Sequence, residues 1–201
     1  MADWQSNLIT DANGIQNLIR ETKVIAVLGI KPESHSDQAA FYVAAHMAAA
    51  GYDVIPVPVY YPEVTEILGK PVFRKLADIG RPVDMIDIFR NSSHIMPVVE
   101  EALKLPVPPK VIWMQLGARD DVAAAKAEAA GIKVVMNRCP KIEYGRLSSE
   151  IAWMGVNSRT LSSKRAPIPT QGMRLSLNRV SVGGGATLAS DRAAKDKTEL
   201  T

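Results

Sequence analysis

The sequence predicts an α/β protein with a Rossmann-like, doubly wound and mostly parallel sheet of five strands, followed by a flexible C-terminal tail. Short apolar segments rich in Val and Ile alternate with segments of helical periodicity, which is the pattern of strands joined by crossover helices. Most of these strand segments are apolar at nearly every position, as in a parallel sheet that helices cover on both faces. Right-handed crossovers then predict a Rossmann-like arrangement with the first strand at the centre of the sheet.

The predicted elements follow in a regular order. A short helix at about residues 12–21 begins after Asp11, a residue type that caps helix N-termini, and its apolar residues share one face. Small residues on one face of the next helix allow it to approach the sheet closely. Gly51 and Gly131 come just after predicted helices, where a left-handed residue ends many helices. The predicted strands are 24–28, 53–59, 84–89, 111–116 and 133–136, and the later helices are about 36–50, 74–78, 93–104, 120–130 and 141–151.

The alternation stops near residue 151, and the charge changes there. Residues 151–201 hold 8 Lys or Arg and 3 Asp or Glu, whereas residues 1–150 hold 16 and 18. The second part is also rich in Ser, Thr, Gly and Pro, with few large apolar residues to offset the entropy lost on ordering. We therefore expect a folded domain at 1–150 and a basic, disordered tail at 151–201.

Composition restricts the class of protein further. No apolar run reaches the roughly 18 residues that a membrane span needs, and the N-terminus lacks the pattern of a signal peptide. The chain has one cysteine, Cys139, which fits a reducing compartment. The three histidines, His35, His46 and His94, are scattered, and no metal-ligand set or catalytic triad stands out. We expect a cytoplasmic protein without a membrane span, a metal site or catalytic residues.

The loop after the first strand is the strongest candidate for a binding site. Gly29 follows an apolar strand, and polar residues then lead into an Ala-rich helix. A strand, a glycine turn and a helix N-terminus form an anion site, because unpaired amides and the positive end of the helix dipole face the same point. In a doubly wound sheet, ligands bind outside the carboxyl ends of the strands. The sequence therefore predicts a phosphate-bearing ligand at this edge.

Two common nucleotides fit the sequence poorly. The loop has one glycine in place of the three-glycine fingerprint of NAD(P) sites, and no carboxylate follows the second strand before Glu63 to hold a ribose. The phosphate loop of ATP-binding proteins is absent, because Gly183-Gly184-Gly185 lacks its lysine and its strand.

Six segments, taken in order, resemble a known family. They are 24–29 with Ser34-His35-Ser36, 51–57, 67–73, 82–90, 113–117 and 134–143. Over about residues 23–147 the chain resembles the small stand-alone CoA-binding domain family, which is similar to the N-terminal domain of the succinyl-CoA synthetase α subunit. The resemblance stops before the second domain of that synthetase, so ligase activity is not implied.

The resemblance implies a coenzyme A site. The candidate cofactor-binding residues are Gly29, Ile30, Lys31, Ser34, His35, Ser36, Pro56, Val57, Phe89, Arg90, Gln115 and Gly117. The phosphates are expected over the first loop and the helix that begins near Ser36. Pro56 and Val57, after the second strand, are expected to flank the adenosine end. Phe89 and Arg90, after the third strand, are expected to cover the adenine or bind a phosphate. Gln115 and Gly117 are expected along the pantetheine arm.

Several of these residues have a second interpretation. Gly29 also suits an ordinary turn, His35 a helix cap and Lys31 the surface. Arg90 could instead form an ion pair with Asp84 or Asp87, carboxylates to which we assign no acid–base role. Cys139 follows the last strand beside Arg138 and near Lys141, which could lower its pKa and allow a mixed disulfide with coenzyme A. Its other interpretation is a packed thiol.

Three functions are consistent with the sequence. The first is binding of coenzyme A or an acyl-CoA by a non-catalytic carrier or sensor module. The second is an NAD(P)-dependent oxidoreductase with a degenerate dinucleotide site. The third is an interaction protein that acts through its basic tail, where RNA, an anionic lipid or an acidic protein are possible partners. We expect nucleic acid only as a partner of that tail, and the sequence specifies neither the acyl group nor an oligomeric state.

Overall fold

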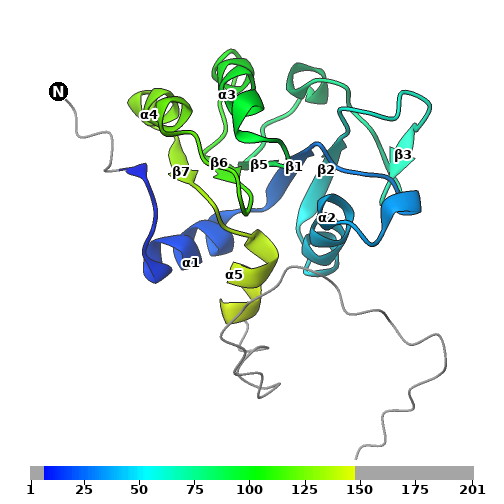
Figure 1. Cartoon of the computed structure of the whole chain (residues 1–201), viewed down its shortest axis with the longest axis horizontal. Helices are drawn as coiled ribbons and strands as arrows, with labels where there is room; N and C mark the ends of the chain where they lie inside the picture. Colours follow the sequence, from blue (N-terminus) through cyan, green and yellow to red (C-terminus); the bar gives the residue numbers. More distant parts are fainter. Residues whose placement is uncertain (1–6, 148–201) are drawn as a thin grey trace, which may run out of the picture. The chain divides into compact units, whose positions relative to one another are not determined.

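The protein is built on one five-stranded parallel sheet (Figure 1). The computed structural model describes residues 7–147. The strands are β1 (Val24–Leu28), β2 (Asp53–Val57), β5 (Met85–Ile88), β6 (Val111–Met114) and β7 (Lys133–Val135), and they lie in the order β2-β1-β5-β6-β7. All four strand pairs are parallel. The predicted fold class is therefore confirmed. The prediction of a central first strand is wrong, because β1 is second from the edge and β5 occupies the centre.

Helices cover both faces of the sheet. On one side lie α1 (Ala12–Glu21), α2 (Ala39–Ala49) and α5 (Pro140–Leu147), and on the other lie α3 (Ile95–Leu103) and α4 (Asp121–Ala129) (Figure 1). Successive strand residues point to opposite faces. In β1, Ala26 and Leu28 belong to the core beneath α3 and α4, whereas Ile25 and Val27 belong to the core beneath α1 and α2. Burial on both faces explains why the strands are apolar throughout.

Local signals place the helix ends well. Asp11 caps α1 by accepting a hydrogen bond from the Gly14 amide at 2.8 Å. Gly51 and Gly131 have the predicted positive φ angles, +97° and +82°. The start of α2 differs from the prediction, because a short turn at Glu33–His35 comes first and Gln38 has an extended backbone, so the helix begins at Ala39 and not at 36. The part of the predicted helix 141–151 beyond 147, and the tail expected at 151–201, lie outside the described residues.

A small hairpin was absent from the sequence prediction. Strands β3 (Glu66–Ile67) and β4 (Lys70–Pro71) pair antiparallel around Leu68 and Gly69, which both have positive φ angles. The Leu68 amide donates a hydrogen bond to Glu33 Oε1 at 2.7 Å, which ties the hairpin to the segment that precedes α2. Short one-turn helices at Leu76–Ile79 and Ser92–His94 complete the fold, the first close to the helix expected at 74–78. Among the described residues, no helix is long and apolar enough to span a membrane.

Gly29 follows β1 and packs against the ends of the two neighbouring strands, β2 and β5. Its amide donates to the Val57 carbonyl at 2.8 Å, and its φ angle is +88°. A Cβ atom built at this position would lie 2.5 Å from the backbone oxygen of Phe89. Both the backbone conformation and the space therefore require glycine here.

We expect Gly29→Ala to lower the free energy of unfolding by about 2–4 kcal/mol, because it combines an unfavourable φ angle with a backbone clash. Gly51→Ala is the matched control. Its φ angle is also positive but open space surrounds it, so its cost is about 1 kcal/mol. Urea denaturation of both variants measures the difference, and equal losses would contradict the role assigned to the Phe89 contact.

Candidate functional site

A cavity of about 350 Å³ lies at the carboxyl ends of the strands. Its walls come from the segments that follow β1, β2, β5 and β6, together with the first turn of α2. The lining residues are Gly29, Lys31, Ala40, Tyr60, Phe89, Arg90, Asn91, His94, Gln115, Leu116, Gly117 and Ala118. The cavity therefore occupies the edge of the sheet at which the sequence places the ligand.

Six of the candidate residues meet in this cavity: Gly29, Lys31, Phe89, Arg90, Gln115 and Gly117. The others lie elsewhere. Ile30 and Val57 are buried in the core, and Pro56 is buried within β2. Ser34, His35 and Ser36 belong to the turn before α2 and do not line the cavity. His35 instead contacts its neighbours, with Nδ1 at 3.0 Å from Ser34 Oγ and Nε2 at 3.4 Å from Tyr61 Oη.

The cavity also contains residues that the sequence prediction did not single out. Tyr60, Asn91, His94 and Leu116 follow strands, but no pattern in the sequence marks their side chains as facing a ligand. Tyr60 is the most conspicuous, because 65% of its surface is exposed and the Arg90 guanidinium carbon lies 5.7 Å from its ring centre. The predicted strand 53–59 is two residues longer than β2, which ends at Val57.

The lining of the cavity is basic. Lys31 and Arg90 contribute positive charge, and none of the described residues that line the cavity is acidic. The ion pair considered for Arg90 is not formed. Asp84 accepts from the Lys23 and Val24 amides, each at 3.0 Å, and Asp87 accepts from Gln115. Within residues 7–147, no carboxylate lies within ion-pair distance of Arg90 or Lys31, and Lys31 Nζ donates to Gln38 Oε1.

Two helices begin at the cavity without a side-chain cap. Gln38 precedes α2 and His94 precedes α3, and neither makes a capping hydrogen bond, whereas Asp11 and Asp120 cap α1 and α4. The first amides of a helix have no partner within the helix, and they carry the positive end of its dipole. In α2 these amides therefore add to the positive potential that Lys31 and Arg90 create. In α3 the Ile95 amide donates to the Ser92 carbonyl and residue 97 is a proline without an N–H, so this helix adds little.

Asp87 lies beneath the cavity in β5 and is 1% exposed. Gln115 Nε2 donates to both oxygens of its carboxylate, at 2.8 Å and 3.0 Å. Burial raises the pKa of Asp87 to about 7, and the hydrogen bond from Gln115 only partly opposes this shift. Asp87 is a buried polar group of the fold, and its contact with Gln115 links it to the cavity.

Cys139 is a packed thiol. It is 1% exposed and packs against Tyr42 and Val43. The expected lowering of its pKa is wrong, because burial raises the pKa of the thiol to about 11. Arg138 is held by Glu143 at 3.1 Å and by the Thr10 carbonyl at 3.0 Å. Lys141 Nζ lies 4.9 Å from the centre of the Tyr42 ring.

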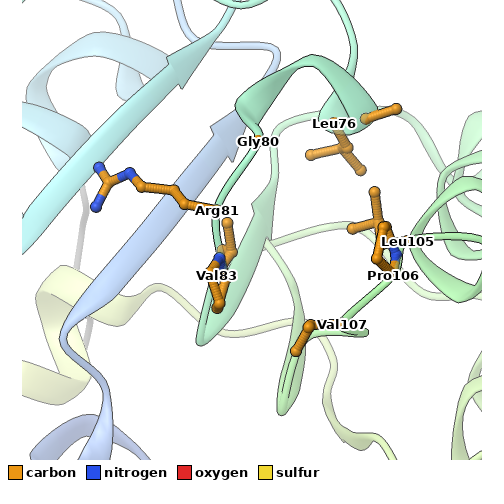
Figure 2. Close-up of a pocket in the computed structure, with 9 residues that line it drawn as sticks. Leu76, Gly80, Arg81, Val83, Leu105, Pro106 and Val107 are labelled. Atoms are coloured by element: carbon orange, nitrogen blue, oxygen red, sulfur yellow. The ribbon is translucent and has the colours of Figure 1, made fainter.

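A second cavity, of about 180 Å³, lies at the opposite end of β5 (Figure 2). Leu76, Val83, Leu105, Pro106 and Val107 supply most of its lining. Arg81 extends away from these apolar residues (Figure 2). Its guanidinium forms an ion pair with Asp53 at 2.7 Å. This cavity offers no free charge to an anionic ligand, so the cavity at the carboxyl ends is the candidate site.

The sheet topology and the position of the cavity assign the protein to the Rossmann-like domains that bind ligands at the carboxyl ends of their strands. The model of the CoA binding domain family matches residues 23–145, and the chain belongs to this family. The resemblance seen in the sequence is thus confirmed.

Individual relatives agree with this assignment. The protein YneT of Bacillus subtilis strain 168 is 32% identical over 130 residues, which span 65% of this chain and 91% of YneT. A protein from Pyrococcus horikoshii OT3 has a similar structure, with a TM-score of 0.61 and 32% identity over 69% of this chain and 93% of that one. A Thermus thermophilus structure gives the same TM-score and identity over 69% of this chain and 99% of its own.

The burial of Asp87 predicts a specific dependence of stability on pH. In the unfolded chain its carboxyl ionises near pH 4, whereas in the folded protein it holds its proton until about pH 7. Between these values the folded state binds more protons, so we expect stability to fall as the pH rises, by up to about 1.4 kcal/mol per pH unit. Asp87→Asn should remove this loss and should be more stable than the unaltered protein at about pH 8.

Chemical denaturation between about pH 5 and pH 8 measures this difference. Asp84→Asn is the control, because Asp84 is a second carboxylate next to β5 whose pKa is lowered, so it stays ionised throughout this range. An unchanged pH slope in Asp87→Asn would contradict the assignment.

Proposed function

We propose that the protein binds coenzyme A or an acyl-CoA in the cavity at the carboxyl ends of its strands and acts as a non-catalytic carrier or sensor. The observation that carries the proposal is the combination of Lys31 and Arg90 with the uncapped N-terminus of α2 in a cavity whose described lining contains no acid. Coenzyme A carries several phosphate charges, and such a cavity offers them both side-chain cations and backbone amides.

The first turn of α2 suits the phosphates. Ala40 brings the open end of the helix to the cavity wall, whereas the Gly29 amide already donates to the Val57 carbonyl. Lys31 is half-buried beside this turn, where its ammonium group already contacts Gln38. We infer that a phosphate lies between Lys31 and the α2 amides, because both attract the same charge.

Tyr60 and Arg90 suit the adenine. The exposed ring of Tyr60 and the guanidinium of Arg90 face each other across 5.7 Å. Aromatic rings and guanidinium planes both stack on nucleotide bases. The resemblance assigned the adenosine end to Pro56 and Val57, but both residues are buried. Tyr60, which follows the same strand and lines the cavity, is therefore the stronger candidate for contact with the base.

The non-catalytic part of the proposal follows from the groups at the site. Asp87 is buried under Gln115, and Cys139 is packed in the core. Within residues 7–147, no group of three or more His, Cys, Asp or Glu side chains is arranged to hold a metal ion. The remaining lining groups are two cations, neutral polar side chains, His94 and apolar residues, and we infer that they hold a ligand unchanged.

Isothermal titration calorimetry with coenzyme A, acetyl-CoA and NADH tests this proposal on the full chain. We expect coenzyme A and acetyl-CoA to bind and NADH to bind weakly or not at all. Binding of NADH without coenzyme A would favour the oxidoreductase interpretation. Binding of none of the three, together with association of the full chain with RNA or anionic vesicles, would favour an interaction protein.

Arg90→Gln should weaken coenzyme A binding about tenfold, because it removes a charge that no described carboxylate neutralises. Its affinity should also depend less steeply on salt concentration. Arg20→Gln is the matched control, because Arg20 is exposed in the last turn of α1 and does not line the cavity. Titrations at two salt concentrations measure both effects, and equal affinities for the two variants would argue against a phosphate or base contact by Arg90.

A further inference from the structure

A buried pair of polar side chains connects the core of the sheet to the cavity. Asp87 in β5 is opposite Trp113 in β6, so Gln115, two residues beyond Trp113, points to the same face of the sheet. Gln115 donates two hydrogen bonds to the Asp87 carboxylate and is itself only 7% exposed. It also lines the cavity. One side chain therefore contacts both the buried carboxylate and the ligand space.

The carboxylate determines which end of the Gln115 amide points inward. An ionised carboxylate only accepts hydrogen bonds, so it faces the NH₂ group of the glutamine amide. The reversed amide would place its carbonyl oxygen against the negative charge and leave the carboxylate without a donor. Because a buried charge without a donor is strongly unfavourable, the observed orientation is the stable one.

The other end of the amide is left for the ligand. Within residues 7–147, Gln115 Oε1 accepts no hydrogen bond, and it is not among the polar atoms that are enclosed without a partner. Since Gln115 lines the cavity, this oxygen is an acceptor available from the ligand space. It lines the same cavity as Lys31 and Arg90, and unlike these cations it offers a site for a neutral donor.

We propose that Asp87 is a positioning residue that holds Gln115 with its Oε1 toward the cavity, where it selects a ligand carrying an N–H or O–H donor. This inference rests on the proposed function, and in coenzyme A the donor is an amide N–H of the pantetheine arm. The phosphates carry no N–H donor, and the base, which does, is assigned to Tyr60 and Arg90. The pair therefore distinguishes the whole cofactor from its nucleotide portion.

The test compares coenzyme A with its phosphoadenosine diphosphate portion, which lacks the pantetheine arm. Calorimetry at about pH 8.5 keeps Asp87 ionised. Gln115→Met removes the acceptor at similar volume and should weaken coenzyme A binding about tenfold, while binding of the nucleotide portion stays unchanged.

The variant Asp87→Asn distinguishes an effect on the orientation of Gln115 from an effect on the stability of the fold. An asparagine at this position can pair with either end of the Gln115 amide, so the outward orientation is no longer fixed. We expect this variant to be more stable than the unaltered protein and yet to bind coenzyme A several-fold more weakly, again without a change for the nucleotide portion. A purely structural role would not lower affinity while raising stability. Asp84→Asn, at the other end of the sheet, should bind both ligands normally.

Each outcome is decisive. Equal weakening for both ligands in Gln115→Met and Asp87→Asn would overturn the inference, because it would indicate general damage to the site. Unchanged coenzyme A binding in both variants would overturn it as well. If the unaltered protein binds the nucleotide portion and coenzyme A equally well, the pantetheine contact is absent although the proposed function stands. If the unaltered protein binds neither, the proposed function fails and this inference fails with it.

Discussion

Burial of the parallel sheet on both faces is the constraint on which the rest of this protein depends. Five parallel strands have side chains above and below, and helices must cover both faces to remove those side chains from water. Within the sheet, polar and charged side chains are consequently found mainly at the strand ends. The two ends of the sheet therefore differ in whether their charged side chains are paired with one another or left unpaired.

Charged side chains are ion-paired at the amino ends of the strands, whereas the cations at the carboxyl ends have no described acidic partner. Near the amino ends of the strands, Asp53 pairs with Lys70 and Arg81, both at 2.7 Å, and Asp84 pairs with Lys110 at 2.8 Å while accepting backbone amides of β1. These contacts connect loops to strands and neutralise one another. At the carboxyl ends, Lys31 and Arg90 face a cavity without a described carboxylate beside them. One end is tied together by ion pairs, and the other keeps a positive potential for a ligand.

Asp87 is the exception, since it is a carboxylate inside the sheet. Its burial disfavours the charged form, as the pKa of about 7 indicates, so it lowers stability near neutral pH. Groups of this kind are concentrated at functional sites, where a destabilising side chain is retained for what it does there. The role that we propose for Asp87 is to orient Gln115, a side chain that lines the cavity, through the hydrogen bonds between them.

Much of the fold and part of the site were accessible from the sequence. The strands and the helix caps follow from apolar periodicity and capping residues, which are local rules. The order of the strands, with β5 and not β1 at the centre, depends on pairing between distant segments and was not predicted. The hairpin β3–β4 was missed because its strands have only two residues each and give no periodic signal. Gly29, Lys31, Phe89, Arg90, Gln115 and Gly117 were placed at the cavity because each follows a strand or its loop, and parallel strands all end at one edge.

The sequence by itself therefore determined the class of fold, the edge of the sheet that carries the cavity and the resemblance to the CoA-binding family. Tertiary structure alone decided which side chains meet there. The pairing of β5 with β6 put Asp87 against Gln115 and away from Arg90, and the loop after β2 carried Tyr60 to Arg90 while Pro56 stayed buried. The packing of Tyr42 and Val43 around Cys139 raised the pKa that its charged neighbours in sequence suggested would fall. Burial and pKa depend on residues far apart in the chain, so a pattern of near neighbours does not contain them.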